Sequence, residues 1–205
     1  MLTLYYANGA CSLAPHIAIE EGNEKYTPKR VDLSKGEQRT PEYMKNVHPL
    51  GRVPALLLDD GSPLTENTAI LPFLGKRFGL WPKDPLAEAK ALSVIGYFAA
   101  TVHPANGHIG RAERYTDDKS AFPGIQAKAK SSYAEYMKQI DAMYAGRDWL
   151  AGDYSVLDPY AFVFYFWHAR RGEPAAELKN YTAMKDRMLE RPAVQRVMED
   201  EGVKV

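Results

Sequence analysis

Residues 2–17 read Leu-Thr-Leu-Tyr-Tyr-Ala-Asn-Gly-Ala-Cys-Ser-Leu-Ala-Pro-His-Ile, a β-prone run followed at once by a helical pattern. The leucine, threonine and tyrosine residues predict a strand over Leu2–Ala7. From Ser12 onward, apolar residues three and four positions apart predict a helix, which Ser12 can cap and Gly22 can end. This stretch therefore predicts a strand that turns directly into a helix, with Cys11 in the turn.

The next sixty residues complete a small mixed sheet. Two further β-prone runs are Tyr26–Leu33 and Ala55–Asp59, and an Asp-Gly pair at 60–61 predicts a hairpin turn into Pro63–Thr65. Apolar spacing over Glu66–Phe78 predicts a helix, in which Pro72 is expected to disturb or kink the axis. We therefore expect an α/β domain over residues 1–80.

After a proline-bracketed linker the pattern becomes helical, which predicts an all-helical domain over residues 86–205. Pro159–Trp167 is apolar on every side and fits either a buried strand or a buried helix. The preceding Ser155-Val-Leu-Asp158 has the form of a reciprocal helix cap and favours the helix. The other predicted helices are Leu92–Val102, disturbed by Pro104 and Gly107, then Ile125–Tyr144, Ala175–Leu189 and Pro192–Glu201.

Composition limits the class of protein. Hydrophobic residues are 45% and charged residues 25% of 205, which is typical of a globular chain and excludes a disordered or collagen-like one. Lys plus Arg and Asp plus Glu are both 26, so we expect neither a nucleic-acid nor a membrane partner. The first residues have no signal-peptide pattern, so we expect a cytoplasmic protein. A single cysteine excludes an intrachain disulfide and a cysteine-rich zinc site, and we expect no metal.

Cys11 is the first candidate for chemistry, because it stands at the mouth of the first predicted helix. The unpaired N–H groups and positive dipole end of a helix favour thiolate, so we expect a pKa below about 8.5. The motif Cys-Ser-Leu-Ala excludes dithiol chemistry within the chain, and no cysteine-protease signature surrounds it. The alternative is a small buried residue without a chemical role.

Two short motifs follow. Pro54, after Val53 at the start of the third strand, can be cis, which would turn backbone groups toward a ligand, or an ordinary trans proline. Thr65-Glu66-Asn67 stands where a strand enters a helix, so backbone donors there could hold a carboxylate, with Glu66 for an ammonium. The alternative for this motif is a helix cap.

Taken in order, these motifs resemble the glutathione transferase superfamily. The stretch Asn8-Gly-Ala-Cys-Ser-Leu-Ala-Pro-His-Ile17 is similar to its bacterial beta class, and the resemblance covers essentially the whole chain. It implies a thioredoxin-like, glutathione-binding first domain, a hydrophobic substrate pocket in the helical domain, a cis Val-Pro bond and a homodimer.

The resemblance also implies roles for particular residues. Cys11 would face the glutathione sulfur, beside a histidine of the helical domain that matches His103 best, with His108 as a rival. The residues expected to bind glutathione are Cys11, Lys35 (glycyl carboxylate), Val53 (cysteinyl backbone), Glu66 and Asn67 (γ-glutamyl head), and His103. Other classes activate glutathione with tyrosine or serine, so Tyr5, Tyr6 and Ser12 remain alternatives to Cys11.

Two functions are open from the sequence. The first is a glutathione transferase that conjugates glutathione, as co-substrate, to small hydrophobic electrophiles or exchanges thiols through Cys11. The second is a non-catalytic protein that binds hydrophobic ligands or a partner on the same fold. An apolar pocket in either could use the aromatic residues of the helical domain, namely Tyr97, Phe98, Tyr133, Phe164 and Trp167.

Overall fold

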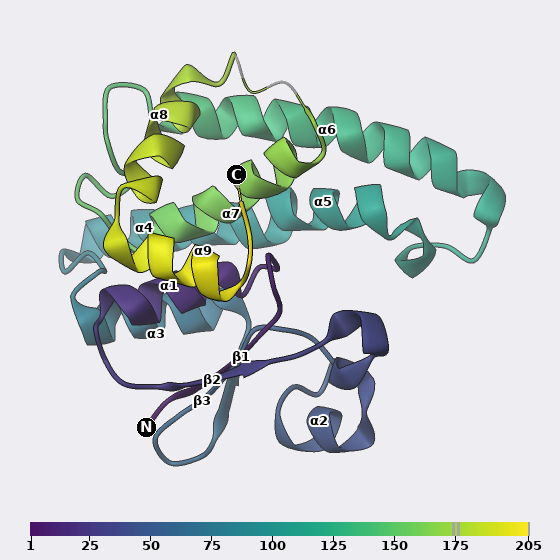
Figure 1. The fold of residues 1–205 in the computed structure, drawn as a ribbon. Helices are drawn as coiled ribbons and strands as arrows, with labels where there is room; N and C mark the ends of the chain where they lie inside the picture. Colours follow the sequence, from purple (N-terminus) through teal and green to yellow (C-terminus); the bar gives the residue numbers. More distant parts are fainter. Residues whose placement is uncertain (174, 176, 205) are drawn as a thin grey trace.

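The first part of the chain is a four-stranded mixed sheet in the order β2-β1-β3-β4 (Figure 1). The computed structural model describes residues 1–173, 175 and 177–204. Strands β1 and β2 are parallel, whereas β1 with β3 and β3 with β4 are antiparallel. The bounds are β1 Thr3–Tyr6, β2 Thr27–Arg30, β3 Ala55–Leu57 and β4 Pro63–Thr65.

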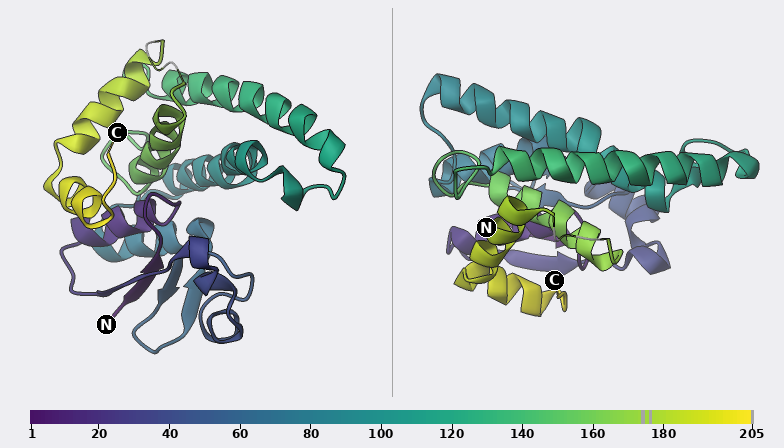
Figure 2. Two further views of the ribbon diagram at one scale, coloured as in Figure 1. Left: turned by 45° about the vertical axis from the view of Figure 1, so that its right-hand side comes forward. Right: turned by 90° about the horizontal axis from the view of Figure 1, so that it is seen from above.

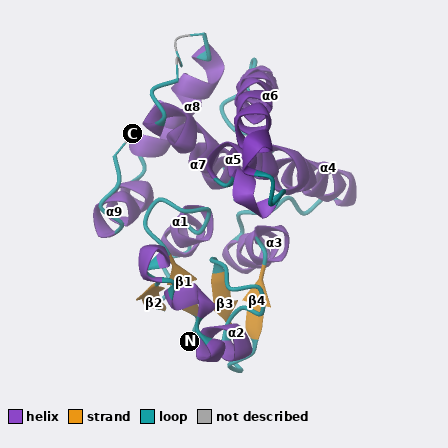
Figure 3. Cartoon of the chain, turned by 90° about the vertical axis from the view of Figure 1, so that its right-hand side faces the viewer, coloured by secondary structure: helices purple, strands orange, loops and turns teal. Residues whose placement is uncertain are grey.

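Two helices, α1 (Leu13–Glu21) and α3 (Asn67–Phe78), cover one face of this sheet, and Figure 3 shows α2 on the other. Side chains alternate along β1, so Leu4 packs under α1 while Tyr5 contacts Tyr43 of α2. Helix α2 was not expected from the sequence. It spans only six residues, Pro41–Asn46, which is too short for a hydrophobic period to show.

The second part is all helical, so the predicted fold class is confirmed (Figure 2). The buried helix predicted at Pro159–Trp167 is also confirmed, as the centre of α7. The bounds are α4 Pro85–Tyr97, a π turn η3 Phe98–Val102, α5 His103–Gly110, α6 Phe122–Met143, α7 Leu157–Arg170, α8 Lys179–Leu189 and α9 Pro192–Asp200. Short 3₁₀ turns are η1 Leu33–Lys35, η2 Glu37–Arg39, η4 Ala112–Arg114 and η5 Lys119–Ala121.

The two parts share one core, because α1 is packed between the sheet below it and α7 and α9 above it (Figure 1). The predicted last helices are present, but α8 begins at Lys179, four residues after Ala175, and residue 176 lies outside the described chain. Among the described residues no helix is long and apolar enough to span a membrane.

Two prolines are accommodated where disturbance was expected. Pro104 is the second residue of α5 and follows the π turn η3, so the helical path continues through it. Pro159 is the third residue of α7, where a backbone N–H has no partner within the helix, so its missing donor costs nothing.

The predicted cap of α7 centres on Asp158, which is fully buried. Its carboxylate accepts hydrogen bonds from the backbone N–H groups of Leu150 and Ser155, both at 3.0 Å, and from the Tyr144 hydroxyl at 3.0 Å. Ser155 accepts from the N–H of Leu157 at 3.3 Å, which completes the reciprocal arrangement. One carboxylate therefore joins the end of α6 to the start of α7.

Candidate active site

The loop between β1 and α1 places Cys11 at the junction of the two parts. Ser12 does not cap α1 as expected: its hydroxyl accepts from the N–H of Ala7 at 3.1 Å and donates to the carbonyl oxygen of Ala7 at 3.2 Å. These two hydrogen bonds join Ala7 and Ser12, the two ends of the loop. Because Ser12 is fully buried and occupied in this way, the structure does not offer its hydroxyl to a ligand.

Gly9, at the tip of this loop, is held by the helical part through both backbone groups. Its N–H donates to Glu201 Oε2 at 2.7 Å, and its carbonyl oxygen accepts from Trp167 Nε1 at 2.8 Å. The residue has φ +62°, and a Cβ atom there would lie 2.9 Å from the Phe166 ring. Only glycine therefore fits, and the loop takes its shape from contacts about two hundred residues away.

The Cys11 thiol donates a hydrogen bond to the carbonyl oxygen of Val53 at 3.3 Å, and the Val53–Pro54 peptide bond is cis, as expected. Burial raises the pKa of Cys11 to about 12, although its own backbone N–H and Arg111 act in the opposite direction. The expectation of a lowered pKa is therefore wrong. Helix α1 begins only at Leu13, and a carbonyl acceptor stabilises the protonated sulfur.

Glu66 and Asn67 lie on the opposite side of Cys11, where β4 passes into α3. Glu66 has φ +69° and ψ +129°, a costly conformation for a residue with a side chain. Its carboxylate is about half exposed and lies 4.0 Å from Nε2 of buried His48. Asn67 is buried and donates from Nδ2 to the carbonyl oxygen of Cys11 at 3.1 Å, while its Oδ1 has no partner among the described residues.

His103 is the first residue of α5 and reaches the same place from the helical part. Its ring packs 5.1 Å from the Trp167 ring, and its Nδ1 lies 3.4 Å from the Tyr160 hydroxyl. Burial, with smaller contributions from Arg111 and Arg52, lowers the pKa of His103 to about 4. The imidazole is therefore neutral at pH 7, with one ring nitrogen that can donate a hydrogen bond and one that can accept one.

Tyr160 is a site residue that sequence reasoning missed. Its ring is fully buried on the first turn of α7, and burial, followed by Cys11, raises the pKa of its hydroxyl. Its hydroxyl is thus neutral and lies 3.4 Å from Nδ1 of His103. Nothing in the apolar run of α7 distinguishes it from the other aromatic residues there.

Several predicted candidates are placed elsewhere. Lys35 extends into solvent, with its ammonium 3.5 Å from Asp32. His108 stacks on Tyr115 at 3.5 Å between ring centroids, and its Nδ1 lies 2.6 Å from the carbonyl oxygen of Pro104. The Tyr5 hydroxyl accepts from Lys29 at 3.2 Å, and the Tyr6 ring packs on His16. The structure does not bring these four side chains together with Cys11.

The aromatic residues expected around a pocket are mostly core. Phe98, Tyr133 and Phe164 are fully buried, whereas Trp167 reaches the site. A cavity of 590 Å³ lies between α5 and α6 and is lined by Ala100, Thr101, Pro104, Ala105, His108, Gly124, Ile125, Lys128, Ala129, Ser132 and Tyr136. Cys11 lies outside this cavity.

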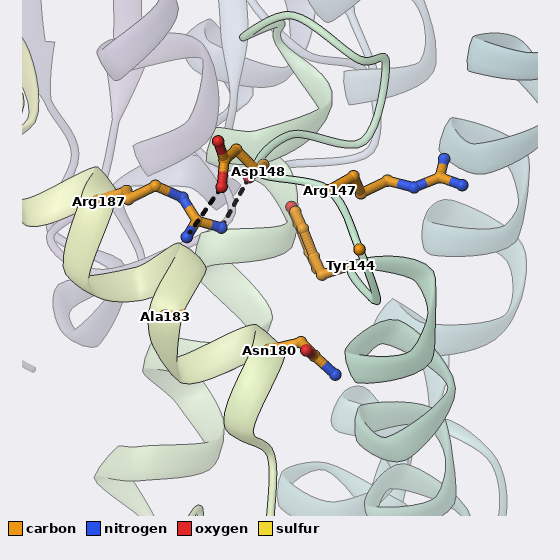
Figure 4. Close-up of a pocket in the computed structure, with 7 residues that line it drawn as sticks. Tyr144, Arg147, Asp148, Asn180, Ala183 and Arg187 are labelled. Atoms are coloured by element: carbon orange, nitrogen blue, oxygen red, sulfur yellow. Dashed lines mark hydrogen bonds and ion pairs between the residues drawn. The ribbon is translucent and has the colours of Figure 1, made fainter.

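A second cavity of 310 Å³ lies beside the end of α6 and α8 (Figure 4). Arg187, which lines this cavity, donates a hydrogen bond to the backbone oxygen of Asp148 at 2.9 Å. Its guanidinium group also lies 3.4 Å from the Asp148 carboxylate. Within the described chain, no three His, Cys, Asp or Glu side chains are grouped to hold a metal ion.

Comparison with known proteins gives consistent results. Residues 1–76 match the family model described as the N-terminal domain of glutathione S-transferase. The chain is 30% identical to the glutathione S-transferase GstA of Escherichia coli O157:H7, over 99% of this chain and 100% of the relative.

Solved structures agree with this family. One neighbour is a glutathione transferase homologue from Sulfitobacter with bound glutathione, at 36% identity and TM-score 0.92, covering 100% of this chain and 99% of the other. Another is the beta-class glutathione S-transferase of Sphingomonas chungbukensis, at 28% identity and TM-score 0.86, covering 98% and 100%.

Proposed function

The chain belongs to the glutathione S-transferase family, and we propose that it binds glutathione beside Cys11 and transfers it to a small electrophile. The single observation that carries this proposal is the meeting of Cys11, Val53 and Asn67 from three separate elements within hydrogen-bond distance. Neutral His103 and Tyr160 reach the same point from the helical part.

Glutathione binding would use groups on the sheet side of the site. The unpartnered Oδ1 of Asn67 and the half-exposed carboxylate of Glu66 suit the ammonium of the γ-glutamyl head. The strained backbone of Glu66 supports this role, because such strain is typical of ligand-binding positions. Val53 would pair its backbone with the cysteinyl part, and Lys35 would have to swing from Asp32 to reach the glycyl carboxylate.

In conjugation, the glutathione sulfur forms a bond to carbon of the electrophile as the leaving group departs. The neutral thiol of Cys11 and the hydroxyl of Tyr160 can donate hydrogen bonds to the glutathione thiolate and stabilise it. The proton that the glutathione thiol releases goes to water, and neutral His103 can donate a further hydrogen bond to the thiolate.

In thiol exchange, Cys11 attacks oxidised glutathione, forms a mixed disulfide and releases one reduced glutathione. The proton of Cys11 must leave to water first, because a histidine with a pKa of about 4 is too weak a base to take it from a thiol with a pKa of about 12. His103 is proposed to donate a hydrogen bond to the departing glutathione thiolate. Because the chain has one cysteine, a second external glutathione must release the adduct.

The proposal extends to the organisation of the protein. Residues 1–80 would form the glutathione-binding domain, and residues 86–205 would supply the second-substrate pocket. A homodimer is proposed from family membership, and light scattering at about 46 kDa rather than about 23 kDa would support it. A cytoplasmic location is supported by a single cysteine that remains a free thiol.

Mass spectrometry after treatment with oxidised glutathione tests the exchange reaction. We expect one adduct on Cys11, reversed by reduced glutathione, slower release in His103→Ala, and no adduct in Cys11→Ser. Retention on a glutathione resin and turnover of an aryl halide test the conjugation. Retention with neither adduct nor turnover would favour the binding protein instead.

A further inference from the structure

His48 is a buried histidine, 2% exposed, in the turn between α2 and β3. Its backbone N–H donates to the carbonyl oxygen of Tyr43 at 3.1 Å, and its own carbonyl oxygen accepts from the N–H of Gly51 at 2.9 Å. Gly51 has φ +59°, and a Cβ atom there would lie 2.7 Å from a backbone oxygen, so this turn requires glycine. Two residues further on, Val53 accepts from the Cys11 thiol. The segment that fixes His48 therefore also leads directly into the site.

One hydrogen bond determines which ring nitrogen of His48 carries the proton. The backbone N–H of Leu50 donates to Nδ1 at 3.2 Å. Because a backbone N–H can only donate, Nδ1 is the acceptor, and in the neutral ring the hydrogen is on Nε2. Burial lowers the pKa of His48, against the opposite effect of Glu66, so the ring is neutral at pH 7. His48 therefore presents an N–H donor that carries no positive charge.

This donor faces Glu66, the acid at the start of α3. Nε2 of His48 lies 4.0 Å from Oε1 of the Glu66 carboxylate, which is about half exposed. Within the described part of the chain the carboxylate accepts no hydrogen bond, and Glu66 does not cap α3 with its side chain. A shift of about 1 Å would bring the two atoms to the usual hydrogen-bond distance of about 2.9 Å. The acid and the donor are thus placed for a hydrogen bond that a small side-chain movement completes.

Resting on the proposed function, we propose that His48 is a positioning residue for glutathione: in the complex its Nε2–H donates to Oε1 of Glu66 and directs Oε2 to the γ-glutamyl ammonium. A carboxylate with one oxygen held in place has less orientational freedom to lose when the ligand binds, so affinity rises. The neutral donor also does this without repelling the ammonium, as a lysine or arginine in its place would. His48 acts through Glu66 and does not touch the ligand.

Two substitutions separate this role from the structural bond to Leu50. In His48→Asn, the amide oxygen takes the place of Nδ1 and can still accept from Leu50, but no donor reaches Glu66. In His48→Gln, the amide nitrogen reaches the place of Nε2 and can still donate to Glu66, but the acceptor for Leu50 is lost. Each variant therefore keeps one of the two interactions and removes the other.

Calorimetry with S-methylglutathione, which cannot react through its sulfur, measures the effect on binding. We expect His48→Asn to weaken binding about 3- to 12-fold, the range for one hydrogen bond, with little change in the urea midpoint. We expect His48→Gln to bind within about twofold of the wild type while its urea midpoint falls. The opposite order, with binding kept in His48→Asn and lost in His48→Gln, would overturn the proposal and leave His48 with its structural bond alone.

Two further measurements show whether His48 acts through Glu66. The S-methylated analogue glutaryl-Cys-Gly lacks the ammonium, so its affinity should change less than about twofold in His48→Asn. In a Glu66→Ala background, His48→Asn should likewise have no further effect on the binding of S-methylglutathione, because the two residues form one unit. A loss that persists in either case would overturn the proposal, since His48 would then contact another part of the ligand.

The ligand-free protein gives an independent test. ¹⁵N NMR should show a protonated Nε2 and an unprotonated Nδ1 in His48, and the reverse tautomer would overturn the proposal without any ligand. Binding that depends on His48, without turnover of an aryl halide, would remove the proposed transfer and support the inference. Equal affinity in the wild type and His48→Asn would overturn the inference alone. No binding by the wild type would overturn both.

Discussion

The start of α7 and the surroundings of Cys11 are both buried and polar, but they use their polar groups differently. At the start of α7, the carboxylate of Asp158 is saturated by four donors: the N–H of Leu150, the N–H and the hydroxyl of Ser155, and the hydroxyl of Tyr144. Around Cys11, Asn67 keeps an unpartnered oxygen among the described residues, and Glu66 holds a strained backbone. Polar groups that hold a fold together are satisfied within it, whereas those of a ligand site remain available.

We expect the largest effect, a loss of stability, when the hydrogen bonds to Asp158 at the start of α7 are removed. Asp158→Ala leaves four buried donors without this acceptor, so we expect a loss of about 3–5 kcal/mol in the free energy of unfolding. Urea denaturation followed by circular dichroism measures this loss. Asp148→Ala, which removes an exposed carboxylate near the same chain segment, is the control and should change stability by less than about 1 kcal/mol. A loss that small for Asp158 itself would remove the contrast between the two regions.

Removing Glu66, the acid of the ligand site, should weaken ligand binding and leave the free energy of unfolding nearly unchanged. Glu66→Ala should weaken glutathione binding by about 1.5–3 kcal/mol, the range for a charged hydrogen bond, with little loss of stability. Isothermal titration calorimetry measures the affinity. Glu66→Gly is the matched variant, because glycine relieves the positive φ: binding should weaken as much as in Glu66→Ala while the free energy of unfolding rises by about 1 kcal/mol. Unchanged affinity in a folded Glu66→Ala protein would contradict the site as a whole.

Tyr160 belongs to both regions, since it lies one turn into α7 and reaches His103. Tyr160→Phe removes only the hydroxyl, so we expect about 1 kcal/mol of lost transition-state stabilisation, or roughly a fivefold lower kcat, at unchanged KM for glutathione. Steady-state kinetics separates the two parameters. Tyr165→Phe, which removes a hydroxyl bonded to Thr182, is the matched control. An equal loss in both variants would indicate a packing effect.

The smallest effect concerns the thiol. Because the pKa of Cys11 is raised to about 12, thiolate absorbance at 240 nm should stay flat from pH 6 to pH 9 in the free protein. The folded state holds its proton through a pH range in which an unfolded thiol, near 8.5, loses it, so this group's contribution to stability falls as pH rises above 8.5. Cys11→Ala supplies the baseline. A titration step near pH 7 would show that the helix mouth controls the sulfur after all.

Local signals in the sequence predicted the fold well where a few adjacent residues determine it. The Asp-Gly turn before Pro63 and the Ser155–Asp158 cap both formed as expected, because each depends on residues no more than a few positions apart. Helix α2 escaped prediction because six residues carry no period.

The site was less predictable, since it depends on contacts between distant residues. Cys11 was found from its place beside a helix, but the carbonyl of Val53, to which its thiol donates, comes from the loop before β3. Pairing across the fold is set by topology, which short motifs do not record.

The two hydrogen bonds that hold the backbone of Gly9 also determine the stage of translation at which the site can first form. Its two partners, Trp167 and Glu201, are translated 158 and 192 residues after it, so a nascent chain can carry the whole sheet without them. At about 5–20 residues per second, roughly 10–40 s separate the emergence of the thiol from that of Glu201. Glu201 also binds His16 at 2.8 Å, so the same late residue fastens both the loop and α1. The cysteine therefore acquires its fixed surroundings only after Glu201 has been translated.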